Sequence, residues 1–405
     1  MGRFGLIGRA LGHSFSPAIH ALIGDYEYKL YPLEPEALDG FLRASDGDGF
    51  NVTIPYKIDA MKSCHELSER ARAIGCVNTV TRLPGGEWRG DNTDWDGFLH
   101  LLGEDAERLR GRPALVLGNG GASRTVRAVL ASCGIPFAVI SRSGDDTYAT
   151  LERHADAELI VNTTPVGMYP KNGASPVDLR LFPKCRLVLD VIYNPMRTAL
   201  LLQAEALGLP ARGGLAMLAA QAVRAGELFL GRELPATLAD RITAAIARRT
   251  GNVALIGMPG CGKTTTAQAL GRLTGRPVRD LDQIVAEREG CPIAEIFARR
   301  GEAAFRRIET EILADVSKES GIIIATGGGV VTQPRNRPLL RQNGICVWLD
   351  RAGELPVDGR PLSQSVGVEE LRRRRLPLYR AWADLTVRGS SAQDAAAKIK
   401  EALQL

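Results

Sequence analysis

The residues from Gly257 to Thr264 have the spacing of a loop that binds phosphate. Three glycines, Gly257, Gly260 and Gly262, lead to Lys263 and Thr264. An apolar strand is predicted directly before the loop, at 253–256, and a helix directly after it. Glycines let backbone N–H groups curl around phosphates, the lysine can reach the outer phosphates, and the hydroxyl can bind Mg²⁺. The pattern and its setting therefore predict a phosphate-binding loop and not an ordinary glycine turn.

Two aspartates and a run of glycines follow this loop along the chain. Asp280 and Asp282 come after a short extended stretch, where one carboxylate could bind a metal through water and the other could accept a proton from an attacking hydroxyl. The alternative is a cap on the helix predicted at 283–288, and from these residues alone the cap is favoured. The glycines at 327–329 follow a predicted strand at 322–325, which permits a ligand to approach the backbone closely.

Six motifs between Val253 and Val387 occur in the order typical of shikimate kinase, and this part of the chain resembles that family. They are GxxGxGK[ST], the DxD pair, FRxxE at Phe305, GGG at Gly327, RPL at Arg360 and RxPLY at Arg375. The resemblance implies a P-loop kinase domain of the nucleoside monophosphate kinase type, with ATP and Mg²⁺ as cofactors. It assigns ATP to Gly257, Gly260, Gly262, Lys263, Thr264 and Thr265, and Mg²⁺ to Thr264 and Asp280.

The same resemblance implies roles for the acceptor side of this site. Asp282 would bind the ring hydroxyls and act as the base, and Arg360 would close from a lid onto the transferred phosphate. The shikimate carboxylate would be held by Arg306, Arg375 and the backbone of Gly328 and Gly329. The stretch 350–360 is shorter than is usual in the family, so we expect the helix whose arginine lies against adenine to be truncated.

A second glycine-rich turn lies earlier in the chain, after a predicted strand at 114–117. Gly118, Gly120 and Gly121 form a Gly-x-Gly-Gly variant of the dinucleotide-binding turn, a weak signal by itself. The next predicted strand ends at Ser141 and Arg142, without the acidic residue that would bind an unphosphorylated ribose. An arginine at this place suits a 2′-phosphate, so the sequence favours NADPH over NADH.

The polar residues of the first hundred positions suggest a site for a small carboxylic acid. Ser14 and Ser16 are suited to bind a carboxylate, although either could cap a helix that starts near Pro17. Lys57 follows a short strand, where an isolated lysine would usually be solvated, and Asp94 could lie beside it and keep it charged.

Eight motifs from Phe4 to about Gly231 occur in the order typical of shikimate dehydrogenase, and this part of the chain resembles that family. They are HSxSP, NVTxPxK, IGxVNT, NTD, GxGGA, NxTPxGM, DxxYxPxxT and GxxMLxxQA. The resemblance implies that Lys57 and Asp94 form the acid/base pair. It assigns the substrate to Ser14, Ser16, Thr53, Asn78, Asp94, Tyr193 and Gln221. It assigns NADP(H) to Gly118, Gly120, Gly121, Ala122, Ser123, Ser141, Arg142, Thr163 and Met217.

Length and composition agree with a multidomain α/β enzyme. The 405 residues, 45% of them hydrophobic, predict two or three domains. We expect a mixed α/β substrate domain at 1–100 with return helices at about 215–248, a Rossmann NADP domain at 101–214 and a kinase domain at 251–405, and the alternation of strands and helices predicts parallel sheets. The net charge of +5 falls wholly after residue 250, which suits anionic small molecules and not nucleic acid. Seven scattered cysteines predict a reducing cytoplasm, and no segment resembles a signal peptide or a membrane span.

The product of the first predicted reaction is the substrate of the second. We therefore predict a bifunctional enzyme that reduces 3-dehydroshikimate with NADPH and then phosphorylates the 3-hydroxyl of shikimate with MgATP. One rival is a ligand-sensing regulator built on inactive copies of both domains, which predicts erosion of the catalytic side chains. A closer rival accepts quinate and NAD at the first site. The sequence leaves the oligomeric state open.

Overall fold

A computed structural model describes residues 2–12, 14–351 and 367–405. Its contacts divide the chain into two compact units, one of residues 1–168, 174–193 and 203–246, the other of residues 169–173, 194–202 and 247–405. The predicted limits of the three domains stay predictions. None of the helices in the described ranges is long and apolar enough to cross a bilayer.

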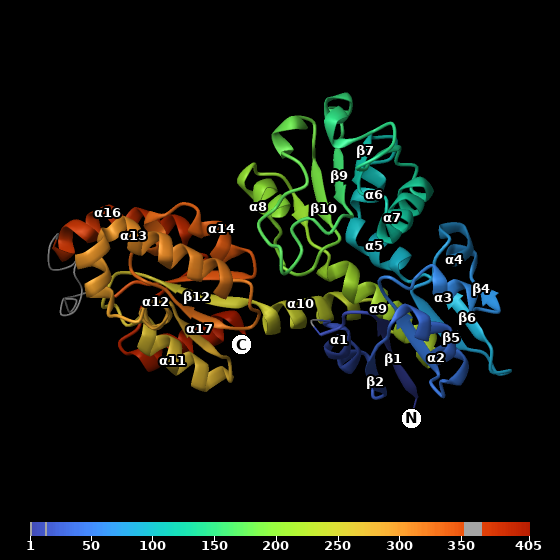
Figure 1. The fold of residues 1–405 in the computed structure, drawn as a ribbon, viewed down its shortest axis with the longest axis horizontal. Helices are drawn as coiled ribbons and strands as arrows, with labels where there is room; N and C mark the ends of the chain where they lie inside the picture. The colour runs from blue at the N-terminus through green and yellow to red at the C-terminus, as the bar shows by residue number, and fades with distance from the viewer. Residues whose placement is uncertain (1, 13, 352–366) are drawn as a thin grey trace. The chain divides into compact units, whose positions relative to one another are not determined.

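The first unit begins with a six-stranded sheet in the order β2-β1-β3-β5-β6-β4 (Figure 1). Its strands are β1 (Arg3–Gly8), β2 (Glu27–Pro32), β3 (Gly49–Val52), β4 (Glu66–Leu67), β5 (Thr79–Arg82) and β6 (Trp88–Asp91). The helices among them are α1 (Ser16–Ile23), α2 (Leu38–Ala44), α3 (Asp59–Lys62) and α4 (Glu69–Ile74), with a 3₁₀ turn at Pro35–Ala37.

The prediction of parallel sheets throughout is wrong for this first sheet. Strand β5 pairs antiparallel with both β3 and β6. The connection from β5 to β6 is a tight turn around Pro84, Gly85 and Gly86, and so short a connection can join only antiparallel neighbours. The resulting sheet is mixed, because β1 pairs parallel with β2 and β3.

The second sheet has five parallel strands in the order β11-β10-β9-β7-β8. They are β7 (Ala114–Leu117), β8 (Phe137–Ile140), β9 (Leu159–Asn162), β10 (Leu187–Asp190) and β11 (Ala211–Arg212). The associated helices are α5 (Asp94–Leu102), α6 (Asp105–Arg108), α7 (Gly121–Ser132), α8 (Ala199–Ala206), α9 (Leu215–Leu230) and α10 (Leu238–Thr250), with 3₁₀ turns at Tyr148–His154 and Leu179–Leu181. The parallel arrangement confirms the predicted Rossmann-like sheet.

Helix α9 returns to pack on α5 and α1. Its crossing with α5 is close, because a Cβ atom on Gly97 would lie 2.6 Å from the backbone oxygen of Met217. Only glycine fits at this contact. The crossing brings Gln221 of α9 near Asn78 and Thr93, where α5 begins.

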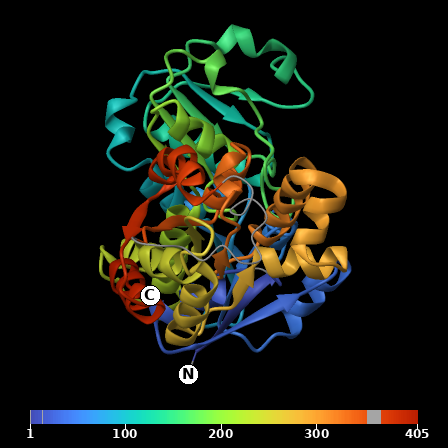
Figure 2. The same cartoon turned by 90° about the vertical axis from the view of Figure 1, so that its left-hand side faces the viewer.

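The third sheet belongs to the second unit and is parallel, in the order β13-β14-β12-β15-β16. Its strands are β12 (Asn252–Ile256), β13 (Val278–Asp280), β14 (Ile323–Ala325), β15 (Gly344–Leu349) and β16 (Leu385–Val387). The helices are α11 (Lys263–Thr274), α12 (Leu281–Glu289), α13 (Ile293–Val316), α14 (Asn336–Arg341), α16 (Val368–Trp382) and α17 (Ala392–Leu403), with a 3₁₀ turn at Val330–Thr332. Helices α11 and α17 cover one face, and α13 and α14 the other (Figure 1; a second view is given in Figure 2).

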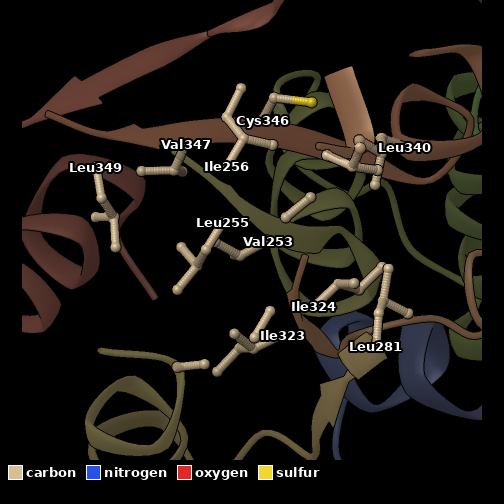
Figure 3. Packing of buried hydrophobic residues seen from close by; sticks show 14 of the residues in the cluster. Val253, Leu255, Ile256, Leu281, Ile323, Ile324, Leu340, Cys346, Val347 and Leu349 are labelled. Carbon is tan, nitrogen blue, oxygen red and sulfur yellow. The ribbon is translucent and has the colours of Figure 1, made fainter. Parts of the chain in front are cut away.

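The central strands of this sheet are buried on both faces. Strands β12 and β14 are fully buried along their length, and Figure 3 shows Leu255 and Ile323 from these strands in one apolar cluster. Unbroken apolar runs of this kind are typical of a parallel sheet that is covered by helices. The glycine loops after β12 and β14 therefore start from rigid supports.

Candidate functional sites

Lys57 and Asp94 form an ion pair in the first unit. Lys57 follows β3 after the turn at Ile54 and Pro55, and Asp94 is the first residue of α5. The Lys57 Nζ and an Asp94 carboxylate oxygen are 2.5 Å apart, and the side chains are only 18% and 12% exposed. An ammonium beside a single carboxylate in a partly dry site is placed to donate a proton to an oxygen that gains negative charge.

A buried group of amides and hydroxyls lies next to this pair. The Asn78 amide donates to the Gln221 side-chain oxygen at 3.3 Å, and the Thr93 backbone N–H donates to the Asn78 oxygen at 2.7 Å. Asn78 and Gln221 are 3% and 8% exposed. The structure thus brings together three residues predicted for the substrate, Asn78, Asp94 and Gln221, through Thr93, the residue before Asp94.

The two predicted serines stand at the start of α1. The Ser16 backbone N–H donates to the Ser14 hydroxyl at 3.2 Å, but the N-cap of α1 is Phe15 and no side chain caps the helix, so neither serine is its N-cap. Ser16 is buried, and Ser14 and Thr53 are half-buried. Tyr193 packs against Phe15 with ring centroids 5.3 Å apart. His13, the first residue of the HSxSP motif, lies outside the described residues.

The predicted NADP(H) residues surround the loop between β7 and α7. Gly118 has a φ of 103°, and a Cβ atom there would lie 2.9 Å from the Thr163 hydroxyl, so this turn requires glycine. Thr163 donates its hydroxyl to the Leu117 carbonyl at 2.6 Å, which ties the strand β9 loop to the glycine loop. Gly120 precedes the first residue of α7, Gly121, and Ala122 follows on that helix.

The remaining predicted cofactor residues differ in exposure. Arg142 follows β8, is exposed, and forms no ion pair within the described part of the chain. Ser141 donates its hydroxyl to the Ser143 carbonyl, which tightens the turn that carries Arg142. Met217 and Ser123 are buried, and the Ser123 hydroxyl has no hydrogen-bond partner among the described residues. A role for the Ser123 side chain in cofactor binding stays a prediction.

In the second unit, the loop after β12 has the backbone shape of a phosphate cradle. Gly257, Gly260 and Gly262 have φ values of 149°, 79° and 95°, which L-residues with side chains rarely adopt. Lys263 is buried and donates to the carbonyls of Gly257 and Met258 at 2.9 Å each. The lysine is therefore folded over its own loop, in reach of an anion that binds at the N-terminus of α11. Thr265, in the first turn of α11, is exposed.

Asp280 caps α12, as the alternative predicted, and also contacts Thr264 of the phosphate loop. One carboxylate oxygen caps α12 by accepting the backbone N–H of Asp282 at 3.0 Å, and the other accepts the Thr264 hydroxyl at 2.6 Å. These are hard oxygen donors of the kind that Mg²⁺ prefers. No group of three or more His, Cys, Asp or Glu side chains within the described ranges could hold a metal. Thr264 and Asp280 nevertheless fit Mg²⁺, because this ion keeps several waters and binds one or two carboxylates together with phosphates.

Arg306 and Glu309 form a buried ion pair beneath the triple glycine. An Arg306 Nη and a Glu309 carboxylate oxygen are 2.8 Å apart, and the side chains are 6% and 0% exposed. Burial raises the pKa of Glu309 above its ordinary value, and the adjacent Arg306 opposes that shift. The other Glu309 oxygen lacks a hydrogen-bond partner among the described residues and lies 2.3 Å from where a Cβ of Gly327 would be. Asp282 is exposed beside it, with an oxygen 3.0 Å from the same point.

Arg375 brings a second guanidinium to the triple glycine. It is 4% exposed and donates to the Gly328 carbonyl at 3.2 Å. The Tyr379 hydroxyl donates to the same carbonyl. Burial lowers the pKa of Arg375, the nearby Arg306 adds to that shift, and Tyr379 opposes it. Within the described residues no carboxylate forms an ion pair with Arg375. A buried and uncompensated cation of this kind favours an anionic ligand.

A small open pocket lies beside the phosphate loop. Its lining includes Cys261 and Thr265 from the loop region, Leu349 and Arg351 after β15, and Ser390 before α17. Arg360, the predicted lid arginine, lies outside the described residues, as does most of the shortened stretch before it.

Two residues with clear structural roles were not among the predicted site residues. Thr93 links Asn78 to Gln221, and Glu309 neutralises Arg306. Both lie inside motifs that the sequence displays, NTD and FRxxE. The motifs could have singled out both residues, but only the packing shows which side chains they contact.

Comparison with known proteins gives consistent results for both units. A sequence model of shikimate kinase matches residues 259–404, and one of the shikimate dehydrogenase substrate binding domain matches residues 6–80. Shikimate dehydrogenase (NADP(+)) of Synechococcus sp. (strain JA-3-3Ab) is 40% identical over 261 residues, which cover 57% of this chain and 88% of that protein. The protein of the same description from Oleidesulfovibrio alaskensis is 38% identical over 265 residues, 60% of this chain and 94% of that protein.

Solved structures show the same likeness. Shikimate 5-dehydrogenase from Thermus thermophilus, solved in complex with NADP(H) and shikimate, superposes with a TM-score of 0.55 at 34% identity, over 60% of this chain and 99% of that chain. A chorismate mutase/shikimate 5-dehydrogenase fusion protein from Clostridium acetobutylicum gives a TM-score of 0.56 at 34% identity, over 61% and 97% of the two chains.

Proposed function

Since the chain belongs to the shikimate dehydrogenase family and carries a shikimate kinase segment after it, we propose that it is a bifunctional enzyme of chorismate and aromatic amino-acid biosynthesis. The first site reduces 3-dehydroshikimate to shikimate with NADPH. The second transfers a phosphoryl group from MgATP to the 3-hydroxyl of shikimate. The substrates of both reactions are small molecules.

In the reductase, Lys57 is the proton donor and Asp94 keeps it charged. NADPH supplies the hydride that reduces the substrate carbonyl. The Lys57 ammonium stabilises negative charge on the carbonyl oxygen and then protonates it. Asn78 and Gln221 orient the ring, and Ser14, Ser16 and Thr53 complete the substrate pocket. Tyr193 would contact the substrate near the cofactor. The pair distance of 2.5 Å and the low exposure of both side chains support these roles.

In the kinase, the chain's residues position two anions. ATP supplies the phosphoryl group, and Thr264 and Asp280 would hold Mg²⁺, which when bound would neutralise phosphate charge. Lys263 binds the outer phosphates. Arg306 and Arg375 hold the substrate carboxylate against the Gly328 and Gly329 backbone, and Asp282 accepts the proton of the attacking hydroxyl. Arg360 is proposed to act on the transferred phosphate.

One observation carries the proposal: a single chain holds two separate sites, the Lys57–Asp94 pair in the first unit and, in the second, a glycine loop with buried Lys263 together with buried Arg306 and Arg375. A ligand sensor would need neither a proton donor nor a phosphate cradle. We also propose NADPH as the preferred cofactor, on the exposed Arg142 after β8, and a location in the reducing cytoplasm, on seven free cysteines.

A coupled assay tests both activities in one mixture. The full-length chain receives 3-dehydroshikimate, NADPH, Mg²⁺ and ATP, and the loss of NADPH and the release of ADP are followed together. We expect ADP to appear only after NADPH is consumed. Lys57→Ala should abolish both signals, and added shikimate should restore ADP release. Lys263→Ala should abolish only ADP release.

Two exposed lysines serve as matched controls. Lys62 and Lys318 form ion pairs on helix surfaces, so Lys62→Ala and Lys318→Ala should leave both rates unchanged. Retention of NADPH oxidation in Lys57→Ala, or of ADP release in Lys263→Ala, would refute the proposal. Replacing 3-dehydroshikimate and NADPH by 3-dehydroquinate and NADH tests the quinate alternative in the same format.

A further inference from the structure

A buried aromatic and amide cluster lies behind the predicted substrate residues of the first unit. His20 of α1 is 1% exposed and stacks on Tyr28 of β2, with centroids 3.8 Å apart and ring planes 10° from parallel. The Tyr26 hydroxyl lies 2.7 Å from His20 Nδ1. The Tyr28 hydroxyl donates to the Asn51 side-chain oxygen at 2.7 Å, and Asn51 is 5% exposed.

The hydrogen bonds of this cluster fix the orientation of the Asn51 amide. Burial lowers the pKa of His20 to about 3, so the ring is neutral and has one N–H group. The Asn51 oxygen accepts the Tyr28 hydroxyl, so the Asn51 NH₂ group points the opposite way, toward the Thr79 hydroxyl.

From Asn51 the hydrogen bonds continue to the predicted pocket. The Asn51 NH₂ donates to the Thr79 hydroxyl at 3.1 Å, and the Thr79 hydroxyl donates to the Asn78 oxygen at 3.2 Å. The Asn78 NH₂ in turn donates to Gln221 at 3.3 Å. The Tyr28 phenol thus stands at the start of a chain of hydrogen bonds that ends at two predicted substrate residues, Asn78 and Gln221.

We propose that Tyr28 is a positioning residue of the dehydrogenase reaction: its hydroxyl sets the Asn51 amide and, through Thr79, orients Asn78 and Gln221 toward the substrate. This inference rests on the proposed function. Without the phenol, the Asn51 oxygen loses a donor, and the amide can rotate away from Thr79. Asn78 keeps its bond from the Thr93 backbone N–H, but the Thr79 hydroxyl is no longer held against the Asn78 oxygen, so Asn78 and Gln221 are less firmly positioned and substrate binding weakens.

The test is Tyr28→Phe with Tyr26→Phe as its matched control. Each variant removes one hydroxyl from the same aromatic stack, but only Tyr28 bonds to Asn51. We expect Tyr28→Phe to raise the KM for shikimate in the NADP⁺-dependent oxidation roughly tenfold, the effect of one hydrogen bond at the strong end of its range, with the KM for NADP⁺ unchanged. Tyr26→Phe should change the shikimate KM by less than about twofold. ATP-dependent phosphorylation by the same chain is the internal reference and should not change.

Thr79→Val provides a second variant, which interrupts the chain of hydrogen bonds one step nearer to the pocket. It should raise the shikimate KM in the same way, so the inference stays testable should Tyr28→Phe not fold. The double variant should raise the KM by less than the product of the two single effects, because both act through one chain.

An equal shikimate KM in Tyr28→Phe and Tyr26→Phe, or full additivity with Thr79→Val, overturns the inference while the proposed function stands. The proposed function itself fails in a different way, since the unaltered chain would then show no NADP⁺-dependent oxidation of shikimate.

Discussion

Gly329→Ala tests the kinase site with the smallest possible change. A Cβ atom at this position would lie 1.9 Å from one Arg306 Nη and 2.2 Å from its Cζ. The backbone φ of Gly329 is −102°, so the alanine adds no backbone strain. The whole effect must come from contact with the guanidinium, which has to retreat by about 1.5 Å to reach ordinary van der Waals separation.

The size of the expected loss in activity follows from the contacts that hold Arg306 in place. Its guanidinium is 6% exposed and pairs with Glu309 at 2.8 Å, so it has little space and cannot leave for solvent. A displacement of that size breaks at least one charge-assisted hydrogen bond to a bound carboxylate, worth about 1.5–3 kcal/mol. We therefore expect kcat/KM for shikimate phosphorylation to fall by about 10- to 100-fold, mainly through KM, with the Kd of ATP unchanged.

Gly271→Ala is the matched control for this variant. Its Cβ would lie 2.8 Å from a Val278 methyl. Gly271 belongs to α11, which covers the face of the sheet opposite to α13, the helix that carries Arg306 (Figure 1). It should lower the stability of the kinase unit without changing the KM for shikimate. Steady-state kinetics with varied shikimate, together with thermal melts of both variants, separate the two effects. A wild-type KM in Gly329→Ala would refute the carboxylate role of Arg306.

Three further predictions follow from single residues. His20 has a folded pKa of about 3 against an ordinary 6.5, so its contribution to stability is complete above pH 6.5 and is lost as the pH falls toward 3. His20→Gln should reduce the slope of unfolding free energy in this range by up to about 1.4 kcal/mol per pH unit, measured by urea titrations; an unchanged slope would contradict burial of a neutral ring. Arg142→Ala should raise the KM for NADPH at least roughly tenfold and leave that for NADH unaltered, because only NADPH carries the 2′-phosphate; equal changes for both cofactors would count against the assignment. Asp282→Asn should lower the kcat of the kinase by about 10²- to 10⁴-fold with the Kd of ATP retained, and single-turnover rates near wild type would exclude Asp282 as the base.

The strands that carry the sites were largely predictable, because buried parallel strands are short apolar runs bounded by glycine or polar residues. The predicted limits of the strands at 114–117, 253–256 and 322–325 agree with those of β7, β12 and β14 to within one residue. The strands that were not predicted, among them β2 and β6, contain charged or half-exposed residues. Their pairing depends on neighbours that are distant along the chain, and local patterns carry little of that information.

The sequence by itself determined which reactive and ligand-binding groups the protein has. These are two glycine loops after strands, a lysine and an aspartate 37 residues apart, and two arginines in motifs on either side of a triple glycine. These features depend only on which residues follow one another along the chain, and this order can be taken directly from the sequence. The tertiary structure decided which groups meet. It placed Asp280 as helix cap and Thr264 partner at once, gave Arg306 a counter-ion but Arg375 none among the described residues, and joined Tyr28 to Gln221 through three intervening side chains. Contacts of this kind follow from packing between distant segments, where sub-ångström fit and desolvation determine which partner a polar side chain finds.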